Sequence, residues 1–167
     1  LSKDSKDSVI LEEIETLLIL PEQTKNETIA LRDKAILETL YATGIRASEL
    51  CGLYIQDLDL HRYQLKILGK GNKERLVPVH ERMVNAVLDY LDNSRPLLFN
   101  KAKTFSDRLF LNNTGHKMER RQVSKIVKKY TIQLRPNESI TTHHIRHSIA
   151  THLLNNGADI RFIQQFL

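Results

Sequence analysis

The chain has 167 residues, of which 41% are hydrophobic and 27% charged, and its formal net charge is +5 at pH 7. This length and balance suit one globular domain with a sizeable core. No apolar run approaches a membrane span, the first ten residues lack the apolar core of a signal peptide, and a single cysteine, Cys51, excludes an internal disulfide. We therefore expect a cytoplasmic protein that does not enter a membrane.

The predicted elements are mainly helical. In chain order, the periodicity predicts helices over 11–20, 27–44, 47–53, about 80–92, 119–134 and 143–156, with a further helix opening at Asp159. Residues 63–79 contain β-rich runs on either side of a Gly/Asn/Lys turn and predict a hairpin. "RLFLN" (108–112) predicts a short strand or a buried extended segment. The expected fold class is mainly α with a small antiparallel β-sheet (α+β), in one domain.

The charge is divided unevenly along these elements. Residues 1–60 contain 6 Lys and Arg against 12 Asp and Glu, whereas residues 61–167 contain 19 against 8. A basic C-terminal part indicates a polyanionic partner. Nucleic acid is favoured over a membrane, because no basic amphipathic helix carries large apolar anchors. The charge by itself is equally consistent with an ordinary solvated surface.

Histidines gather in "ITTHHIRHSIATHLLNNG" (140–157). His143 and His147 have the i, i+4 spacing of a helical zinc site. Such a site needs a third ligand, yet the chain has no HExxH and no cysteine pair, and the cationic Arg146 would lie beside the ion. We therefore expect no metal and no cofactor, with a zinc site as the weaker alternative.

The same segment suits a phosphate better. Thr141 or Thr142 can cap the helix, which puts His143 and Arg146 on one face of its first turn. Exposed backbone N–H groups and the positive end of the helix dipole favour an anion there. Arginine donates a planar fork to two phosphate oxygens, and histidine adds a donor whose protonation can change.

Two other segments carry candidate phosphate ligands. In "YATGIRASELCGL", Arg46 follows a glycine helix stop, and Glu49 is placed three residues on, where it can hold the Arg46 guanidinium. In "GKGNKERLVP", Lys70 and Lys73 fall on the predicted hairpin tip, from which a flexible ammonium could enter a duplex groove. The P-loop pattern is absent. Each segment alone is better explained as ordinary surface charge.

Three stretches together resemble the tyrosine recombinase (phage integrase) family, and most of all its Xer-type site-specific recombinases: "RDKAILETLYATGIRASELCGL", "ILGKGNKERLVPV" and "HHIRHSIATHLLNNGADIRFIQQFL". The resemblance implies a catalytic domain in which the catalytic residues are Arg46, Lys70, His143 and Arg146, with Glu49 in support. "MERRQVSKIVKKY" is similar to the segment that lays a helix against DNA. It implies DNA contacts by Arg120, Arg121 and Lys125, and the hairpin implies one by Lys73.

The resemblance also implies a reaction. Double-stranded DNA is cut and rejoined without metal through a 3′-phosphotyrosyl link, in a tetrameric synapse. The family's pattern continues beyond Leu167 to a tyrosine nucleophile, and its separate N-terminal clamp domain has no counterpart in residues 1–167. We therefore expect 1–167 to be a catalytic-domain fragment that is inactive in cleavage. A non-cleaving DNA-binding module on the same scaffold is the alternative, and a metal-dependent nuclease is a third.

Overall fold

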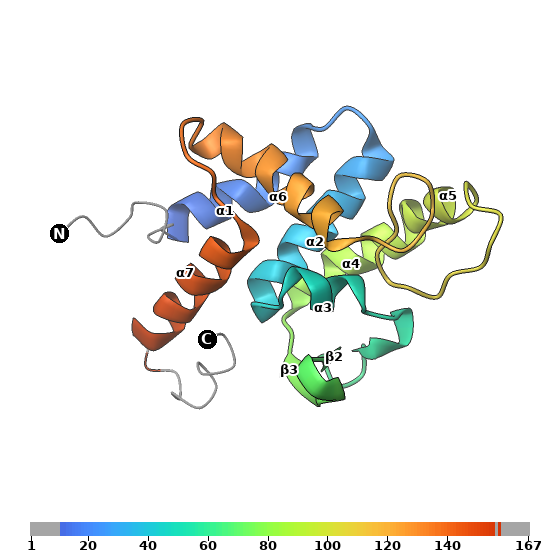
Figure 1. Cartoon of the computed structure of the whole chain (residues 1–167), viewed down its shortest axis with the longest axis horizontal. Coiled ribbons are helices and arrows are strands. Elements are labelled where there is room, and N and C mark those ends of the chain that lie inside the picture. Colours follow the sequence, from blue (N-terminus) through green and yellow to red (C-terminus); the bar gives the residue numbers. More distant parts are fainter. Residues whose placement is uncertain (1–10, 156, 158–167) are drawn as a thin grey trace.

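The computed structural model describes residues 11–155 and 157, and it is mostly helical (Figure 1). The helices are α1 (Leu11–Ile19), α2 (Glu27–Thr43), α3 (Ala47–Cys51), α4 (Glu81–Asn93), α5 (Arg95–Phe99), α6 (Arg120–Leu134) and α7 (Thr142–Asn155). Short 3-10 turns are η2 (Leu20–Gln23), η3 (Ile55–Asp57) and η4 (Lys70–Asn72). The predicted fold class is confirmed, and the helix predicted to open at Asp159 lies outside the described residues.

The sheet is small and antiparallel. Its strands β1 (Leu58–Asp59), β2 (Gln64–Leu68) and β3 (Glu74–Pro78) lie in the order β1-β2-β3. The predicted hairpin is therefore present, with a short third strand beside it. Leu65, Ile67 and Val77 are buried on one face, and alternate residues point outward, as the period of two for a half-buried strand requires.

Helix α2 organises the molecule, since it packs against α1, α4, α5, α6 and α7. It begins at an Asn26 cap, whose side chain accepts a hydrogen bond from the Ile29 N–H at 3.1 Å. It ends at Gly44, which has the left-handed φ of 61° that a helix C-cap favours in glycine. The predicted glycine stop is confirmed, and it brings the chain directly into α3.

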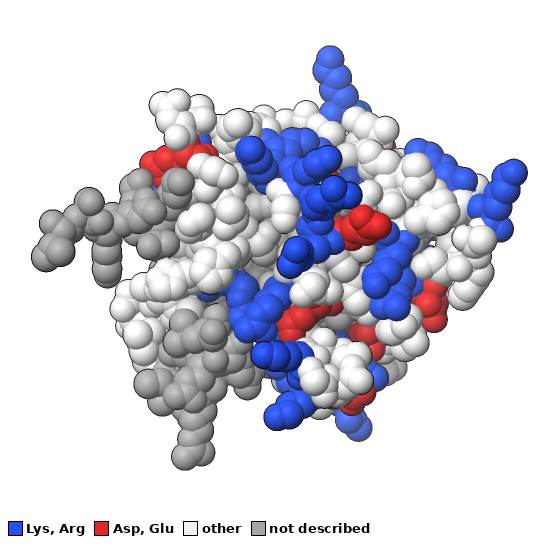
Figure 2. All heavy atoms as spheres, viewed as in Figure 1, with Lys and Arg blue, Asp and Glu red and all other residues white. Residues whose placement is uncertain are grey.

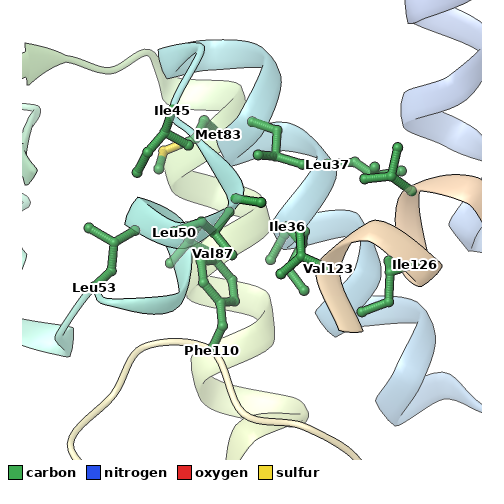
Figure 3. Packing of buried hydrophobic residues seen from close by; sticks show 14 of the residues in the cluster. Ile36, Leu37, Ile45, Leu50, Leu53, Met83, Val87, Phe110, Val123 and Ile126 are labelled. Carbon is green, nitrogen blue, oxygen red and sulfur yellow. The ribbon is translucent and has the colours of Figure 1, made fainter. Parts of the chain in front are cut away.

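The core lies between these helices. Figure 3 shows Ile36 of α2, Leu50 of α3, Val87 of α4 and Val123 of α6 packed around Phe110, and all five are at most 1% exposed. Phe110 belongs to the stretch 108–112, which is a buried extended segment with isolated β-bridges at Arg108 and Leu111. The core therefore fixes α3 against both α2 and α6.

The helices differ from those expected chiefly in the length of α3 and in the presence of α5. The predicted helix over 47–53 is shorter, because α3 ends at Cys51 and the backbone turns at Gly52. Helix α5 was not predicted, since five residues beginning with Arg95 and Pro96 are too short to show a periodicity. No helix among the described residues is both long and apolar enough to cross a membrane.

Candidate functional site

Arg46 lies where α2 gives way to α3. It is the N-cap residue of α3, and its backbone N–H donates to Glu49 Oε1 at 2.9 Å. The guanidinium Nη1 lies 3.9 Å from the same oxygen, and the Arg46 side chain is 49% exposed. The backbone of Arg46 is thus anchored by Glu49 while its guanidinium is presented at the surface.

Glu49 itself is buried and doubly paired. Arg75 of β3 donates to it through both ends of its guanidinium, with Nη1–Oε2 at 2.7 Å and Nη2–Oε1 at 3.1 Å. Burial by itself would raise the pKa of the Glu49 carboxyl, but the hydrogen bonds from Arg75 and the Arg46 N–H, with the charges of both arginines, outweigh it and leave the pKa below its ordinary value. Glu49 is therefore a carboxylate at neutral pH. Sequence reasoning anticipated a Glu49–Arg46 contact and missed Arg75.

Lys70 approaches the same place from the hairpin. It opens η4, at the tip between β2 and β3, and its side chain is exposed. The preceding residue, Gly69, lies against the ion pair, since a Cβ there would be 3.0 Å from Arg75 Nη1 and 3.2 Å from Glu49 Oε2. A cavity of about 380 Å³ opens at this point, and we call it the α3–hairpin cavity. Its lining residues are Arg46, Ser48, Glu49, Leu68, Gly69 and Lys70.

Arg146 comes to the α2–α3 junction from α7. Figure 1 shows the first turns of α7 beside the end of α2. The residue is 6% exposed, and its Nη1 donates to the backbone oxygen of Gly44. Burial, together with the charges of nearby Arg46 and Arg75 and against the opposing effect of Glu49, lowers the pKa of Arg146 to about 10. Arg146 therefore stays protonated at neutral pH, in the electrostatic field of Arg46.

His143 lies one turn before Arg146. Thr141 is the residue that caps this turn, because its hydroxyl accepts the His144 N–H at 3.4 Å and its own N–H donates to His144 Nδ1 at 3.0 Å. His143 is exposed, and its ring stands edge-on to that of His144. Among the described residues, no group of three or more His, Cys, Asp or Glu side chains could hold a metal ion.

The remaining candidates form a second basic region. Arg120, Arg121 and Lys125 are exposed along the first half of α6, and we call them the basic face of α6. Lys73 is exposed just beyond the hairpin tip. In Figure 2, Lys and Arg side chains gather on one face of the molecule, over α6 and over the region of α3 and the hairpin. The elements that carry Arg46, Lys70, Lys73 and the basic face of α6 therefore border this face.

A polar network also fixes α6 to α2. Asp33 is fully buried, and its Oδ2 accepts the Lys129 ammonium at 2.7 Å and the Tyr130 hydroxyl at 2.5 Å. Arg32 donates to Oδ1 of the same carboxylate at 3.0 Å. This buried network sets the helix axis of α6 relative to α2, and nothing in the local sequence pattern had indicated it.

Comparison with known proteins gives a consistent result. Residues 9–167 match the phage integrase family. Tyrosine recombinase XerC of Natranaerobius thermophilus is 45% identical over 159 residues, which make up 94% of this chain and 52% of that protein. Tyrosine recombinase XerD of Staphylococcus epidermidis is 39% identical over 165 residues, 99% of this chain and 55% of that protein. The chain thus spans about half the length of these relatives.

Solved structures agree in fold. The crystal structure of XerA recombinase superposes with a TM-score of 0.76 at 32% identity, covering 95% of this chain and 55% of that one. XerH site-specific recombinase, in a pre-cleavage complex with its difH substrate, gives a TM-score of 0.78 at 24% identity, covering 96% of this chain and 46% of that one.

Proposed function

The chain belongs to the phage integrase family of tyrosine recombinases, and from this premise we propose that it forms the catalytic core of a site-specific DNA recombinase. In this proposal, double-stranded DNA is cut and rejoined through a 3′-phosphotyrosyl intermediate without a metal. The observation that carries the proposal is that Arg46 and Lys70, from two elements far apart in sequence, line the α3–hairpin cavity, while Arg146 of α7 lies within the electrostatic reach of Arg46 and Glu49. The DNA-bound state of the XerH structure supports DNA as the partner.

The cations fit the charge that phosphoryl transfer develops. When a hydroxyl attacks a DNA phosphate, negative charge grows on the two non-bridging oxygens, and preorganised donors stabilise it. Arg46 and Arg146 supply planar forks suited to those oxygens. His143, one turn before Arg146, supplies a further donor. Lys70 protonates the departing 5′-oxygen as general acid.

The nucleophile in this proposal comes from outside residues 1–167. The chain has five tyrosines, and none lines the described wall of the α3–hairpin cavity. The Tyr90 hydroxyl donates to the Leu109 carbonyl at 2.9 Å, and burial raises its pKa to about 12. The Tyr130 hydroxyl is committed to Asp33. In a recombinase, the tyrosine-bearing segment of the family would follow α7 and supply the attacking oxygen.

The surroundings of the cavity have a separate role in the proposal. The basic face of α6 and Lys73 contact DNA phosphates and set the register of the duplex, while the cavity takes the phosphate that reacts. The tetrameric synapse of the family would bring four such cavities onto two duplexes.

The test uses a pool of nicked suicide duplexes with a randomised central site, which trap cleavage as a covalent adduct. Residues 1–167 extended with the family's tyrosine-bearing segment should form an adduct visible on a denaturing gel. Residues 1–167 alone should bind the pool and form none, and neither should the extended chain with that tyrosine changed to phenylalanine.

Two outcomes would contradict the proposal. An adduct formed by 1–167 alone would show that one of its own tyrosines attacks, and peptide mapping would identify it. An extended chain that binds DNA but never forms an adduct would instead support a non-cleaving DNA-binding module on this scaffold.

A further inference from the structure

Arg75 occupies an unusual place in the hairpin. It is paired across the sheet with Ile67 and lies two residues before Val77, so it faces the side of the sheet on which both of those residues are buried. Its side chain is only 22% exposed. A largely buried charge on an otherwise apolar face is costly unless a partner compensates for it, so the partner of Arg75 is informative.

The partner is Glu49, 26 positions earlier in the chain. Each terminal nitrogen of the guanidinium donates to a different carboxylate oxygen, Nη1 to Oε2 at 2.7 Å and Nη2 to Oε1 at 3.1 Å. A two-point contact of this kind fixes the relative orientation of the two groups as well as their separation. It therefore joins β3 of the hairpin rigidly to α3.

Glu49 passes this constraint on to Arg46. Its Oε1 accepts Arg75 Nη2 at 3.1 Å and the Arg46 backbone N–H at 2.9 Å, and the Arg46 guanidinium lies 3.9 Å away. Oε1 of Glu49 thus accepts hydrogen bonds from both the hairpin and the beginning of α3. Loss of Arg75 would leave Glu49 buried and able to turn toward the Arg46 guanidinium.

Gly69 brings Lys70 into the same arrangement. The Gly69 backbone lies so close to the ion pair that a Cβ would meet both Arg75 and Glu49, and its N–H donates to the Lys73 carbonyl at 2.8 Å. Lys70 follows directly. The contact of Gly69 with the Arg75–Glu49 pair therefore sets the backbone position of Lys70 at the end of β2.

We propose that Arg75 is a positioning residue for DNA cleavage: through Glu49 it holds Arg46 and Lys70 at a fixed separation across the α3–hairpin cavity. This inference rests on the proposed function. Arg75 does not contact the scissile phosphate, because its fork is occupied by Glu49. Its contribution is geometric, and a displacement of about 1 Å at a reacting group can cost about 10²-fold in rate.

The experiment separates cleavage from binding in the extended, tyrosine-bearing chain. Single-turnover cleavage should fall about 10²-fold in Arg75→Ala, while the dissociation constant for the duplex changes by less than about twofold. Arg75→Lys keeps the charge but not the fork, so it should recover only part of the rate. Arg62→Ala removes an exposed arginine from the turn before β2 and should cleave like the parent.

A double-mutant cycle tests the route through Glu49. In a Glu49→Ala background, Arg75→Ala should cause little further loss, because its partner is already gone. Losses that multiply, together with a weakened duplex affinity, would make Arg75 a direct DNA contact and overturn the inference. Cleavage by Arg75→Ala at the parental rate would also overturn it.

Two controls keep the result interpretable. If Arg75→Ala does not fold by its melting curve, Arg75→Lys carries the test, and it must cleave more slowly than the parent at unchanged affinity and melting temperature. A parent that binds the duplex without forming an adduct would refute the proposed function itself, and with it this inference. That result differs from an active parent whose Arg75 variants are all equally active.

Discussion

The α3–hairpin cavity and the basic face of α6 are both rich in cations but hold them differently. At the cavity, the Arg46 backbone is anchored by buried Glu49, and nearby Arg146 is bound to the Gly44 carbonyl. On α6, the candidate side chains are exposed along the helix. Fixed donors suit the localised charge of a phosphoryl-transfer transition state, whereas exposed ones suit a phosphate backbone whose binding is dominated by counterion release. We therefore expect the same residue types to serve chemistry in one region and affinity in the other.

Buried carboxylates explain the contrast. Glu49 lines the cavity and holds the Arg75 guanidinium and the Arg46 backbone, while Asp33 holds α6 through Lys129 and Tyr130. Substitutions at the cavity should therefore affect rate and stability, and substitutions on the exposed face of α6 should affect affinity.

The largest expected effect is that of Lys70→Ala in the extended, tyrosine-bearing chain. An alkoxide is a poor leaving group near neutral pH, so loss of the general acid should slow single-turnover cleavage by roughly 10²–10⁴-fold. Replacing the bridging 5′-oxygen with sulfur should restore most of this rate, because a thiol with a pKa of about 8.5 leaves without a proton. Arg46→Ala and Arg146→Ala should not be rescued, since they leave charge on the non-bridging oxygens unneutralised.

This result would distinguish the roles of the cations at the cavity: Lys70 would be the general acid, and Arg46 and Arg146 would stabilise charge on the phosphate. Equal rescue of all three variants, or no rescue of Lys70→Ala, would reduce Lys70 to a DNA contact of the kind expected on α6. Lys73, on the same hairpin, would then be the next candidate for the acid.

The next effect is on stability. Glu49→Gln leaves Arg75 without its carboxylate, and we expect the free energy of unfolding at pH 7 to fall by about 3 kcal/mol, at the low end for buried pairs because Arg75 is 22% exposed. Chemical denaturation of residues 1–167 measures it. The neighbouring variant Glu74→Gln, at a side chain that is 62% exposed, should cost less than about 1 kcal/mol.

The pH dependence of this difference follows from the lowered pKa of Glu49. The unfolded chain binds the proton more readily than the folded one, so the stabilisation is complete above the ordinary carboxyl pKa of about 4.3 and is lost as pH falls through the folded pKa. The gap between parent and Glu49→Gln should therefore narrow on acidification. If the difference in free energy of unfolding between parent and Glu49→Gln did not change with pH, or were as small as that for Glu74→Gln, Glu49 would not hold its partners as a carboxylate.

Much of the fold could be predicted from periodicity, because the long helices and the hairpin bury one face each. What could not be predicted depends on partners distant in sequence. Arg75 stands between Glu74 and Leu76 in what reads as an ordinary exposed turn and strand, and only its phase with Val77 hints that it faces inward. Even that phase does not reveal Glu49 as the partner.

The candidate site shows the same limit. Motif reasoning selected Arg46 and Lys70 separately, and the structure places both in the lining of one cavity because the α2–α3 junction meets the hairpin there. Motif reasoning could not predict how deeply each side chain is buried. Burial distinguishes Arg146, which is 6% exposed, from the exposed His143 on the same helix turn. Nor did the pattern of α2 indicate that Asp33 anchors α6, since that contact joins residues 96 and 97 positions apart.

A smaller effect is expected on α6. DNA binding by residues 1–167 should be weak, poorly selective and steeply salt-dependent, because it rests on phosphate contacts. Alanine at Arg120, Arg121 or Lys125 should reduce the slope of log affinity against log salt by about 0.9 each, in fluorescence anisotropy over a salt series. Lys103→Ala, an exposed lysine after α5, is the matched control. An unchanged slope would remove the basic face of α6 from the DNA interface.

The smallest expected effect, none at all, concerns zinc. His143 and His147 have a zinc-like spacing, but both side chains are exposed, and no third ligand joins them among the described residues. Arg146, between them in sequence, is a protonated guanidinium at neutral pH, which disfavours a divalent cation and favours an anion. Elemental analysis of purified protein should therefore find no stoichiometric zinc, and a chelator should leave the melting temperature unchanged. About one zinc per chain, lost on chelation with a fall in melting temperature, would favour the metal-dependent nuclease and would replace the phosphate cavity with a metal site.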